Sequence, residues 1–513
     1  MPVGFSSPSR NLFLLGSSGE QVVTNFFKAI DQSLGTDGVY LPDEIRYNFL
    51  DQKYILSGSA SDSNSRGFGW IEKRDVNGTA EWSIRVERSQ AGINTTLRAM
   101  ELDVNDNLIV VGKTGSIPWI AKYSNGGVIN WQSTTSSANV EYTGVASDSG
   151  GNYYACGNTP LSGDSQAFVE KFSSSGTPVW SKSSVMLGRD VVLNKIAANT
   201  RGQVVAVGYL EDDTANKGYI VKIDTNTGEI LWDKTLSTRE YGSNFANPLV
   251  VTKDCICLGV YIDINDQIYV CGYKANIDTY DVGFVIKYTA EGNMIWQKEM
   301  RGFPTAADIG DGVGYRFTDV KADGETEQVV VLSQSSVGLG GSDISLYKFS
   351  KNGDVVFRRR LTSDRDGPTP TATSNSSLDA DPSFYYLLFT DQEIDGLNGT
   401  PDKYTFGKVS SSGNGLGAFE YTSDVGVTID YTYGENTGYL SIVDGVISDG
   451  SIRNDTSDLK TYPFSANKLL FDDLATQVSN KKRQMDSADS FEYGATTTPS
   501  GSSPGLTSTR TPA

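Results

Sequence analysis

The same short phrase occurs seven times along this chain of 513 residues. Each copy has a lysine near its start, a polar turn with a glycine, and a large aromatic residue four positions after that glycine. Self-similarity at a nearly fixed period is typical of repeat architectures. The copies are IEKRDVNGTAEW (71–82), IAKYSNGGVINW (120–131), VEKFSSSGTPVW (169–180), IVKIDTNTGEILW (220–232), VIKYTAEGNMIW (285–296), LYKFSKNGDVVF (346–357) and FGKVSSSGNGLGAF (406–419).

A second, strongly apolar phrase precedes each copy. Its consecutive Val, Ile and Tyr residues predict a strand that is buried on both faces. A looser strand comes before it, and Asn, Asp and Gly mark the turns. The phrases are KYILSG (53–58), NLIVVG (107–112), NYYACG (152–157), QVVAVG (203–208), QIYVCG (267–272), QVVVLS (328–333) and FYYLLF (384–389).

Each repeat therefore offers about four strands in meander order, and we predict an all-β fold, a seven-bladed β-propeller of four-stranded antiparallel blades. A β-helix or open solenoid is the competing fold, but its rungs are shorter than the intervals of 49 to 64 residues between the aromatics. The glycine permits a tight turn with positive φ. We expect each aromatic to pack between neighbouring blades rather than to stack on a ligand.

Segments outside the repeats divide the rest of the chain. We expect residues 1–42 to form a docking segment with a short helix over 18–30, because Ser18 and Gln21 have capping-box spacing before an apolar stripe. The propeller is expected over 43–420. Residues 421–484 form a C-terminal β/helical extension: further strands at 425–447, which either close the ring or form a separate sheet, precede a helix over 466–484. The Ser/Thr/Pro-rich tail, 485–513, is expected to be flexible. Whether an N-terminal or a C-terminal strand closes the ring stays open.

Charge and apolar patterning limit the partners. The formal net charge of −19 disfavours nucleic acid and anionic membranes. No apolar run approaches the roughly 20 residues that span a bilayer, and the first residues do not resemble a secretory signal. We therefore expect synthesis and folding in a cytoplasm.

The residue types also restrict the chemistry. The chain has no histidine, which excludes Ser-His-Asp and Cys-His catalysis and His-bound metals. Cys156 and Cys271 are interpreted as buried strand thiols, and Cys255 and Cys257 as residues on one side of a strand, with a metal pair as the minor alternative.

Other candidate motifs are equally weak. Asp103/Asp106 and Asp263/Asp266 are interpreted as turn residues rather than calcium ligands. We predict no catalytic, cofactor-binding or metal-binding residues, no cofactor and no enzymatic activity. The long insertions at 235–254 and 361–383 are the expected binding loops, or variable surface without a role.

Two N-terminal stretches carry a family resemblance. GFSSPSRNLFLLGSSGEQVVTNFFKAIDQS and DGVYLPDEIRYNFLDQKYILSGSASDSNS resemble virion structural proteins of contractile-tailed cyanobacterial phages, most strongly over about the first 160 residues. The blade phrases resemble bacterial β-propeller repeats.

The resemblance implies a non-enzymatic tail or baseplate component, present in several copies in the virion, assembled in the host cytoplasm and bound to other virion proteins. A host-surface glycan is a further possible partner. The alternatives are a glycan-binding propeller and, less favoured, a polysaccharide-degrading enzyme.

Overall fold

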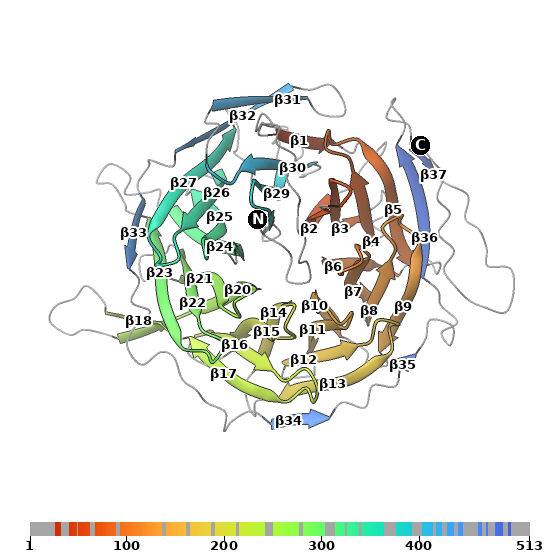
Figure 1. Cartoon of the computed structure of the whole chain (residues 1–513), viewed down its shortest axis with the longest axis horizontal. Coiled ribbons are helices and arrows are strands. Elements are labelled where there is room, and N and C mark those ends of the chain that lie inside the picture. Colours follow the sequence, from red (N-terminus) through yellow and green to blue (C-terminus); the bar gives the residue numbers. More distant parts are fainter. Residues whose placement is uncertain are drawn as a thin grey trace, which may run out of the picture.

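The computed structural model describes the strands of the ring and part of the C-terminal extension (Figure 1). The described residues are 26–31, 40–48, 50–61, 67–88, 93–135, 140–160, 165–185, 190–211, 215–236, 238–241, 250–275, 281–302, 313–323, 326–337, 341–363, 376–391, 403–413, 417–422, 428–435, 440–444, 460–463, 468–469, 478–485 and 491–493.

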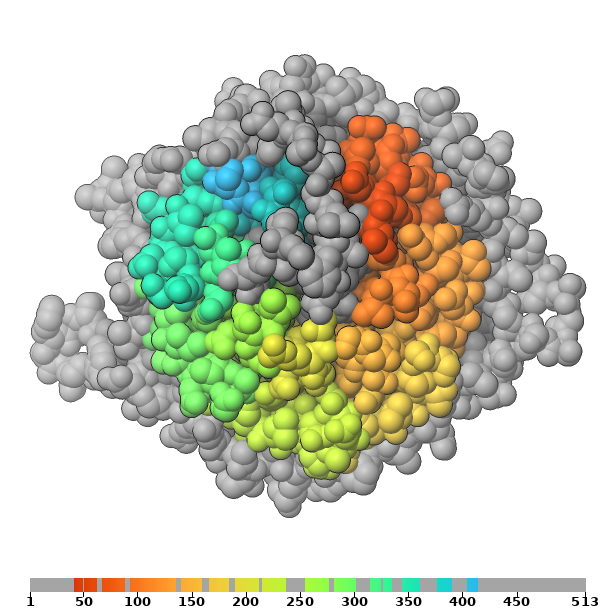
Figure 2. All heavy atoms as spheres, viewed as in Figure 1, coloured from red at the N-terminus to blue at the C-terminus, as the bar shows by residue number. Residues whose placement is uncertain are grey.

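Seven four-stranded antiparallel sheets surround a central axis, which confirms the predicted seven-bladed propeller (Figure 1). The described residues of successive blades follow one another around the ring (Figure 2). Blade 1 contains β2 (Tyr40–Asn48), β3 (Lys53–Ser61), β4 (Gly67–Arg74) and β5 (Ala80–Arg88). Blade 2 contains β6 (Thr95–Leu102), β7 (Leu108–Thr114), β8 (Ile117–Tyr123) and β9 (Ile129–Thr135). Blade 3 contains β10 (Glu141–Ser147), β11 (Tyr153–Pro160), β12 (Ser165–Phe172) and β13 (Pro178–Val185).

The remaining blades follow the same plan. Blade 4 contains β14 (Val191–Ala198), β15 (Val204–Leu210), β16 (Lys217–Ile223) and β17 (Ile230–Leu236). Blade 5 contains β20 (Cys255–Ile262), β21 (Ile268–Ala275), β22 (Asp281–Tyr288) and β23 (Met294–Gly302). Blade 6 contains β24 (Val313–Ala322), β25 (Val329–Val337), β26 (Gly341–Phe349) and β27 (Val355–Ser363). Blade 7 contains β28 (Ser377–Ala380), β29 (Phe384–Asp391), β30 (Lys403–Ser410) and β1 (Phe26–Asp31).

The core is divided among the junctions between blades. Seven clusters of buried apolar side chains occur among the described residues, one at each junction. In β7, Leu108 and Val110 pack toward blade 1, whereas Ile109 and Val111 pack toward blade 3. All four are at most 1% exposed, so the second strand of the blade is buried on both faces, as predicted.

An N-terminal strand closes the ring. β1 pairs antiparallel with β30 and places Phe26 opposite Lys408. Trp82 occupies the same register position opposite Lys73 in blade 1, and Trp180 does so opposite Lys171 in blade 3. Phe26 is therefore the seventh aromatic by register. Phe419, which the repeat alignment assigned to that place, lies instead in β31 (Gly417–Thr422), which pairs with β32 (Thr428–Glu435).

The helix predicted over 18–30 is wrong where the structure describes it. Residues 26–30 belong to β1, and residues 18–25 lie outside the described residues. The open edge of β30 offers unpaired backbone groups to a strand. An apolar run with two phenylalanines and an isoleucine also suits a strand, so the tertiary pairing decides its conformation.

Perimeter strands add to the outer edges of five blades. After β32 pairs with β27 of blade 6, the chain pairs with blades 5, 3, 2 and 1 in that order, which is backward around the ring (Figure 1). The strands are β33 (Leu440–Asp444) on β23, β34 (Lys460–Pro463) on β13, β35 (Lys468–Leu469) on β9 and β36 (Val478–Met485) on β5.

The C-terminal extension thus differs partly from expectation. The strands expected at 425–447 exist, but they widen blades instead of closing the ring or forming a separate sheet. The helix predicted over 466–484 is wrong at 468–469 and 478–484, which are strand. In this segment, pairing with open sheet edges outweighs the helical tendency of the local apolar stripe. Within the expected flexible tail, β37 (Phe491–Tyr493) pairs with β36, and residues 494–513 lie outside the described part.

The two faces of the ring are built differently. Turns between first and second strands and between third and fourth strands are short and share one face, which we call the short-turn face. The links between blades join strand ends at the other, long-link face. They range from five residues at 136–140 to eighteen at 237–254, and the longest link lies in the longest repeat interval, from Trp232 to Trp296.

Candidate functional site

The repeated lysine and tryptophan form a clamp between blades. In blade 3, Lys171 Nζ and Trp180 Nε1 both donate to the Thr225 carbonyl in a turn of blade 4, at 2.8 and 3.1 Å. Lys222 and Trp232 of blade 4 donate in the same way to Ala290 of blade 5, at 2.7 and 3.1 Å. The aromatics therefore pack between blades, as predicted, and four of them, Trp131, Trp180, Trp232 and Trp296, also donate a hydrogen bond to a turn of the next blade.

In blades 2 to 6, the glycine of the phrase receives the preceding blade's aromatic. Gly228 has φ +76°, and a Cβ there would lie 2.8 Å from the Trp180 ring. Gly176 has φ +79°, and its Cβ would lie 2.5 Å from Trp131. Both the left-handed backbone and the close approach require glycine at these turns. The recurring phrase thus encodes both halves of one junction.

The carboxylates of Asp103 and Asp263 accept hydrogen bonds from backbone N–H groups of their own turns. Asp263 Oδ1 accepts the backbone N–H groups of Asn265 and Gln267 at 2.8 and 2.9 Å, and Tyr269 donates its hydroxyl to Oδ2 at 3.0 Å. Asp103 accepts two backbone N–H groups in the same way and pairs with Lys122 at 2.8 Å. These contacts explain both carboxylates as turn residues.

The four cysteines are buried free thiols, as interpreted for Cys156 and Cys271. Cys255 and Cys257 both pack in the junction between blades 4 and 5. Burial raises the pKa of Cys156 and of Cys255 to about 12, which keeps these thiols protonated. Among the described residues, no group of three or more His, Cys, Asp or Glu could hold a metal ion.

An ionic cluster joins the innermost strands of four blades, and we call it the axial cluster: Glu44, Arg46, Glu101, Lys195 and Asp319. Lys195 of blade 4 reaches Glu44 of blade 1 at 2.9 Å and Asp319 of blade 6 at 3.4 Å. Arg46 lies 3.1 Å from Glu44 and 3.4 Å from Glu101 of blade 2. The two Lys195 pairs tie together blades on different sides of the ring, and the pair between Arg46 and Glu101 joins blades 1 and 2.

Two carboxylates of the axial cluster, Glu44 and Asp319, stay ionised. Burial opposes ionisation of Glu44, but Arg46 and Lys195 outweigh it and lower its pKa. Burial likewise opposes ionisation of Asp319, but Lys195 and Lys321 lower its pKa. The backbone N–H of Met100 donates to Glu44 at 2.8 Å, and that of Leu378 donates to Asp319 at 3.1 Å. Paired in this way, the cluster suits a structural role better than acid–base chemistry.

Sequence reasoning missed the axial cluster, although a signal existed. Glu44, Lys195 and Asp319 each follow a β-bulge at the same position of an innermost strand. Apolar or small residues, Ala99 and Gly144, fill that position in blades 2 and 3. Charged residues in an otherwise buried strand were the available sign that these positions meet.

A second missed cluster lies toward the long-link ends of the inner strands. Glu141 accepts from Arg98 Nε and lies 2.7 Å from Lys113 Nζ. Burial opposes its ionisation, but Arg98 and Lys113 lower its pKa. Burial raises the pKa of nearby Asp43, which accepts from Ser59 at 3.4 Å. Two carboxyl groups with pKa values pushed apart are a feature of acid–base sites.

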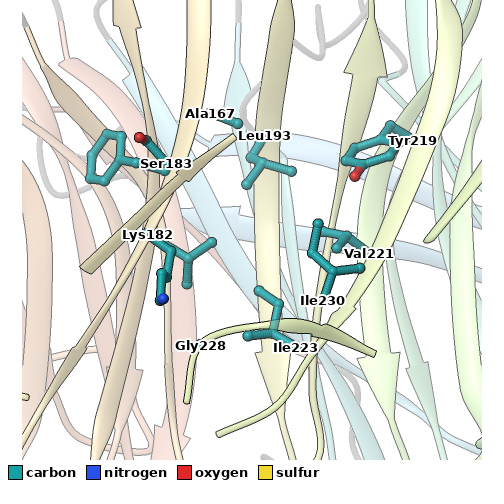
Figure 3. A pocket seen from close by; sticks show the side chains of 11 residues that line it. Ala167, Lys182, Ser183, Leu193, Tyr219, Val221, Ile223, Gly228 and Ile230 are labelled. Carbon is teal, nitrogen blue, oxygen red and sulfur yellow. The ribbon is translucent and has the colours of Figure 1, made fainter. Parts of the chain in front are cut away.

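A small cavity of about 30 Å³ lies between blades 3 and 4 (Figure 3). Leu193, Val221 and Ile230 give it a largely apolar lining. Lys182 occupies the position that Ile84 holds in blade 1, and its ammonium group pairs with Glu229 at 2.7 Å. The cavity holds little more than water and is a packing gap rather than a ligand pocket.

The predicted binding loops are only partly described. Within 235–254, β18 (Thr238–Tyr241) and β19 (Val250–Lys253) form a separate two-stranded sheet, and 242–249 lie outside the described residues. Within 361–383, the ends belong to β27 and β28, and 364–375 lie outside the described part. In the described ranges, no helix has the length and apolar character to span a membrane.

Comparisons with known proteins give only remote likenesses. No protein-family model and no curated protein matches the chain. The polysaccharide lyase Uly1 has 10% identity and a TM-score of 0.44, over 72% of this chain and 89% of its own. Sqt1 from Chaetomium thermophilum has 11% identity and a TM-score of 0.39, over 80% and 98%. The tail fibre of Staphylococcus aureus phage P68 has 11% identity and a TM-score of 0.17, over 64% and 95%. At these scores the likenesses support no argument, so the seven-bladed propeller rests on the strand pairing of this chain itself.

Proposed function

We propose that this chain is a non-enzymatic structural protein of a phage particle, in the tail or baseplate, where the propeller is a rigid platform for other virion proteins or for the host surface. The resemblance of its N-terminal stretches to virion structural proteins motivates the proposal. The observation that carries it is the clamping of the blades to one another: Lys171 and Trp180 hold blade 4, and Lys222 and Trp232 hold blade 5.

The axial cluster supports the same proposal. Its ion pairs join innermost strands that an open, ligand-binding channel would leave separate. The perimeter strands pair with the outer edges of five blades. A ring held at its axis, junctions and perimeter is suited to transmitting force and position within an assembly.

Mass spectrometry of purified particles tests the proposal. Particles banded in a density gradient should contain this chain at a constant ratio to the major capsid protein, through repeated purification. An abundant host chaperone serves as the control and should be depleted at each step. Loss of the chain in parallel with the chaperone would contradict a place in the particle.

A glycan-binding propeller is the second candidate, and the β18–β19 hairpin favours it. This hairpin is not part of any blade sheet, and it stands outside the ring (Figure 1). Glycan arrays would compare the full chain with a variant in which 242–249 are replaced by a short glycine linker. Binding that disappears in the variant would support this candidate, and absence of binding by the full chain would contradict it.

The separated pKa values of Asp43 and Glu141 are the observation that favours a polysaccharide-degrading enzyme. Its test is turnover of host envelope polysaccharide by the full chain and by the Asp43→Asn variant. Turnover by the full chain that the variant lacks would support this activity. Equal turnover by both, or none by either, would contradict a role of this pair.

A further inference from the structure

Among the described residues, the exposed large apolar side chains lie on one side of the ring. All ten large hydrophobic residues that are prominently exposed among the described residues lie in short turns or at the start of outermost strands, toward the short-turn face. Single exposed apolar residues are ordinary on protein surfaces, but grouped ones mark interaction sites. The ten are Leu50, Val76, Val104, Val128, Val179, Leu231, Met294, Ile295, Val355 and Val356.

Four of them occupy one register position in four successive blades. Each directly precedes the junction aromatic of blades 3 to 6, and their exposed fractions are 54%, 54%, 47% and 50% for Val179, Leu231, Ile295 and Val356. The same position holds Glu81 in blade 1 and Asn130 in blade 2. We call these four residues, with Met294 and Val355 beside them, the apolar arc.

The perimeter strands leave this part of the outer edge uncovered in the described structure. β34 pairs with β13 only from Lys182 onward, β33 with β23 from Lys298, and β32 with β27 from Arg359. The apolar arc lies before these points on each strand. The half-buried rings of Trp180, Trp232 and Trp296 adjoin it. Tryptophan is enriched at the energetic centres of protein interfaces, and methionine is enriched at interfaces in general.

Charge indicates the kind of partner. The turns that lead into the outermost strands of blades 4 to 6 carry one lysine, Lys351, and four acidic residues, Asp224, Glu229, Glu291 and Asp354, of which Glu229 is already paired with Lys182 at 2.7 Å. A partner that buries the arc therefore meets a negative border and gains from basic residues around an apolar centre. A second copy of the chain, with its own net charge of −19, would meet like charge.

We infer that the apolar arc of blades 3 to 6 docks a protein partner whose contact surface is apolar at its centre and basic at its edge. The inference rests on the proposed function, since it names the face by which the platform is held in the particle. It also assigns the opposite, long-link face, with its variable links, to the side away from this partner.

The test is a pair of matched double variants introduced into the phage genome. Leu231→Asp with Ile295→Asp places charge in the apolar arc. Val76→Asp with Val128→Asp is the control, because both residues are exposed in turns of blades 1 and 2, outside the arc. Thermal unfolding of each purified chain checks that it folds. If the aspartates lower the midpoint, serines at Leu231 and Ile295 replace them.

Targeted mass spectrometry then counts copies of the chain per particle. We expect a loss of about tenfold or more for the arc variant and less than about twofold for the control, because two central apolar residues of an interface are removed. Equal copy numbers per particle for the two variants would overturn the docking role of the apolar arc but not the proposed function. Absence of the unaltered chain from particles would instead overturn the proposed function. If the purified chain forms dimers that persist in the control variant but are lost in the arc variant, the partner is a second copy of the chain. That result would overturn the inference of a basic partner.

Discussion

Trp180 contributes to its blade junction in two separable ways: its ring packs between the blades, and its indole N–H donates a hydrogen bond. Trp180→Ala removes its ring from the junction with Gly228 and its hydrogen bond to Thr225, and should destabilise the ring by about 2 to 4 kcal/mol. Trp180→Phe keeps a ring, as Phe357 does in blade 6, and should cost only about 1 kcal/mol for the hydrogen bond. Thermal and urea unfolding measure both. Equal losses for the two variants would contradict a role in packing.

Asp381 is the turn carboxylate for which pH matters most. Burial raises its pKa to about 6, although Tyr386 and two backbone N–H groups bind it. Because the folded pKa exceeds the ordinary value of 3.8, its contribution to stability is present below about pH 4 and is lost as pH rises through 6. The loss reaches about 3 kcal/mol at most. Asn48 and Asn199 hold the equivalent turns, so Asp381→Asn should fold.

The measurement is urea unfolding of both proteins from pH 4 to pH 7. The wild type should lose stability relative to Asp381→Asn across this range, because only the wild type must ionise a buried carboxyl group. A constant difference between the two would show that Asp381 does not titrate there.

At the level of strands, the axial cluster holds elements that share no sheet. Lys195→Met removes one ionic partner from Asp319 and leaves Glu44 with Arg46 as its remaining ionic partner, and should cost about 3 kcal/mol at neutral pH. The pKa values of Glu44 and Asp319 are lowered in the folded state, so the stability from these ion pairs is present above about pH 4 and is lost in acid. The cost of the variant should therefore shrink below pH 4.

Arg201→Met is the control for this prediction. It breaks an exposed pair with Asp266 and should cost less than about 1 kcal/mol at any pH. Urea unfolding at pH 7 and pH 3.5 compares the two variants. A Lys195→Met variant that behaves like the control would mean that the axial ion pairs add no net stability.

For the molecule as a whole, the perimeter strands protect sheet edges. Deletion of 436–513 removes β33, β34, β35, β36 and β37 but leaves all seven blades and the closing strand β1. The uncovered edges of β5, β9, β13 and β23 should then pair between molecules, because open edges are templates for association. Light scattering after gel filtration should show oligomers. Deletion of 494–513 alone is the control, and this variant should have the same oligomeric state as the full chain. Identical behaviour of the two deletions would contradict a protective role.

Local patterns predicted much of this molecule. The blade count, the buried second strands and the junction aromatics are visible because each depends on residues within one repeat, and the same packing problem recurs seven times. The turn role of Asp103 and Asp263 was predictable for the same reason: their hydrogen-bond partners lie two and four residues away.

Contacts between distant segments decided the rest. The run at 26–30 suits a helix or a strand locally, and only the open edge of β30 makes it β1 and puts Phe26 where Phe419 was expected. The perimeter strands likewise take their conformation from the edges they meet. Lys195, Glu44 and Asp319 become neighbours only when seven sheets close into a ring, because no spacing along the chain records which innermost strands face one another.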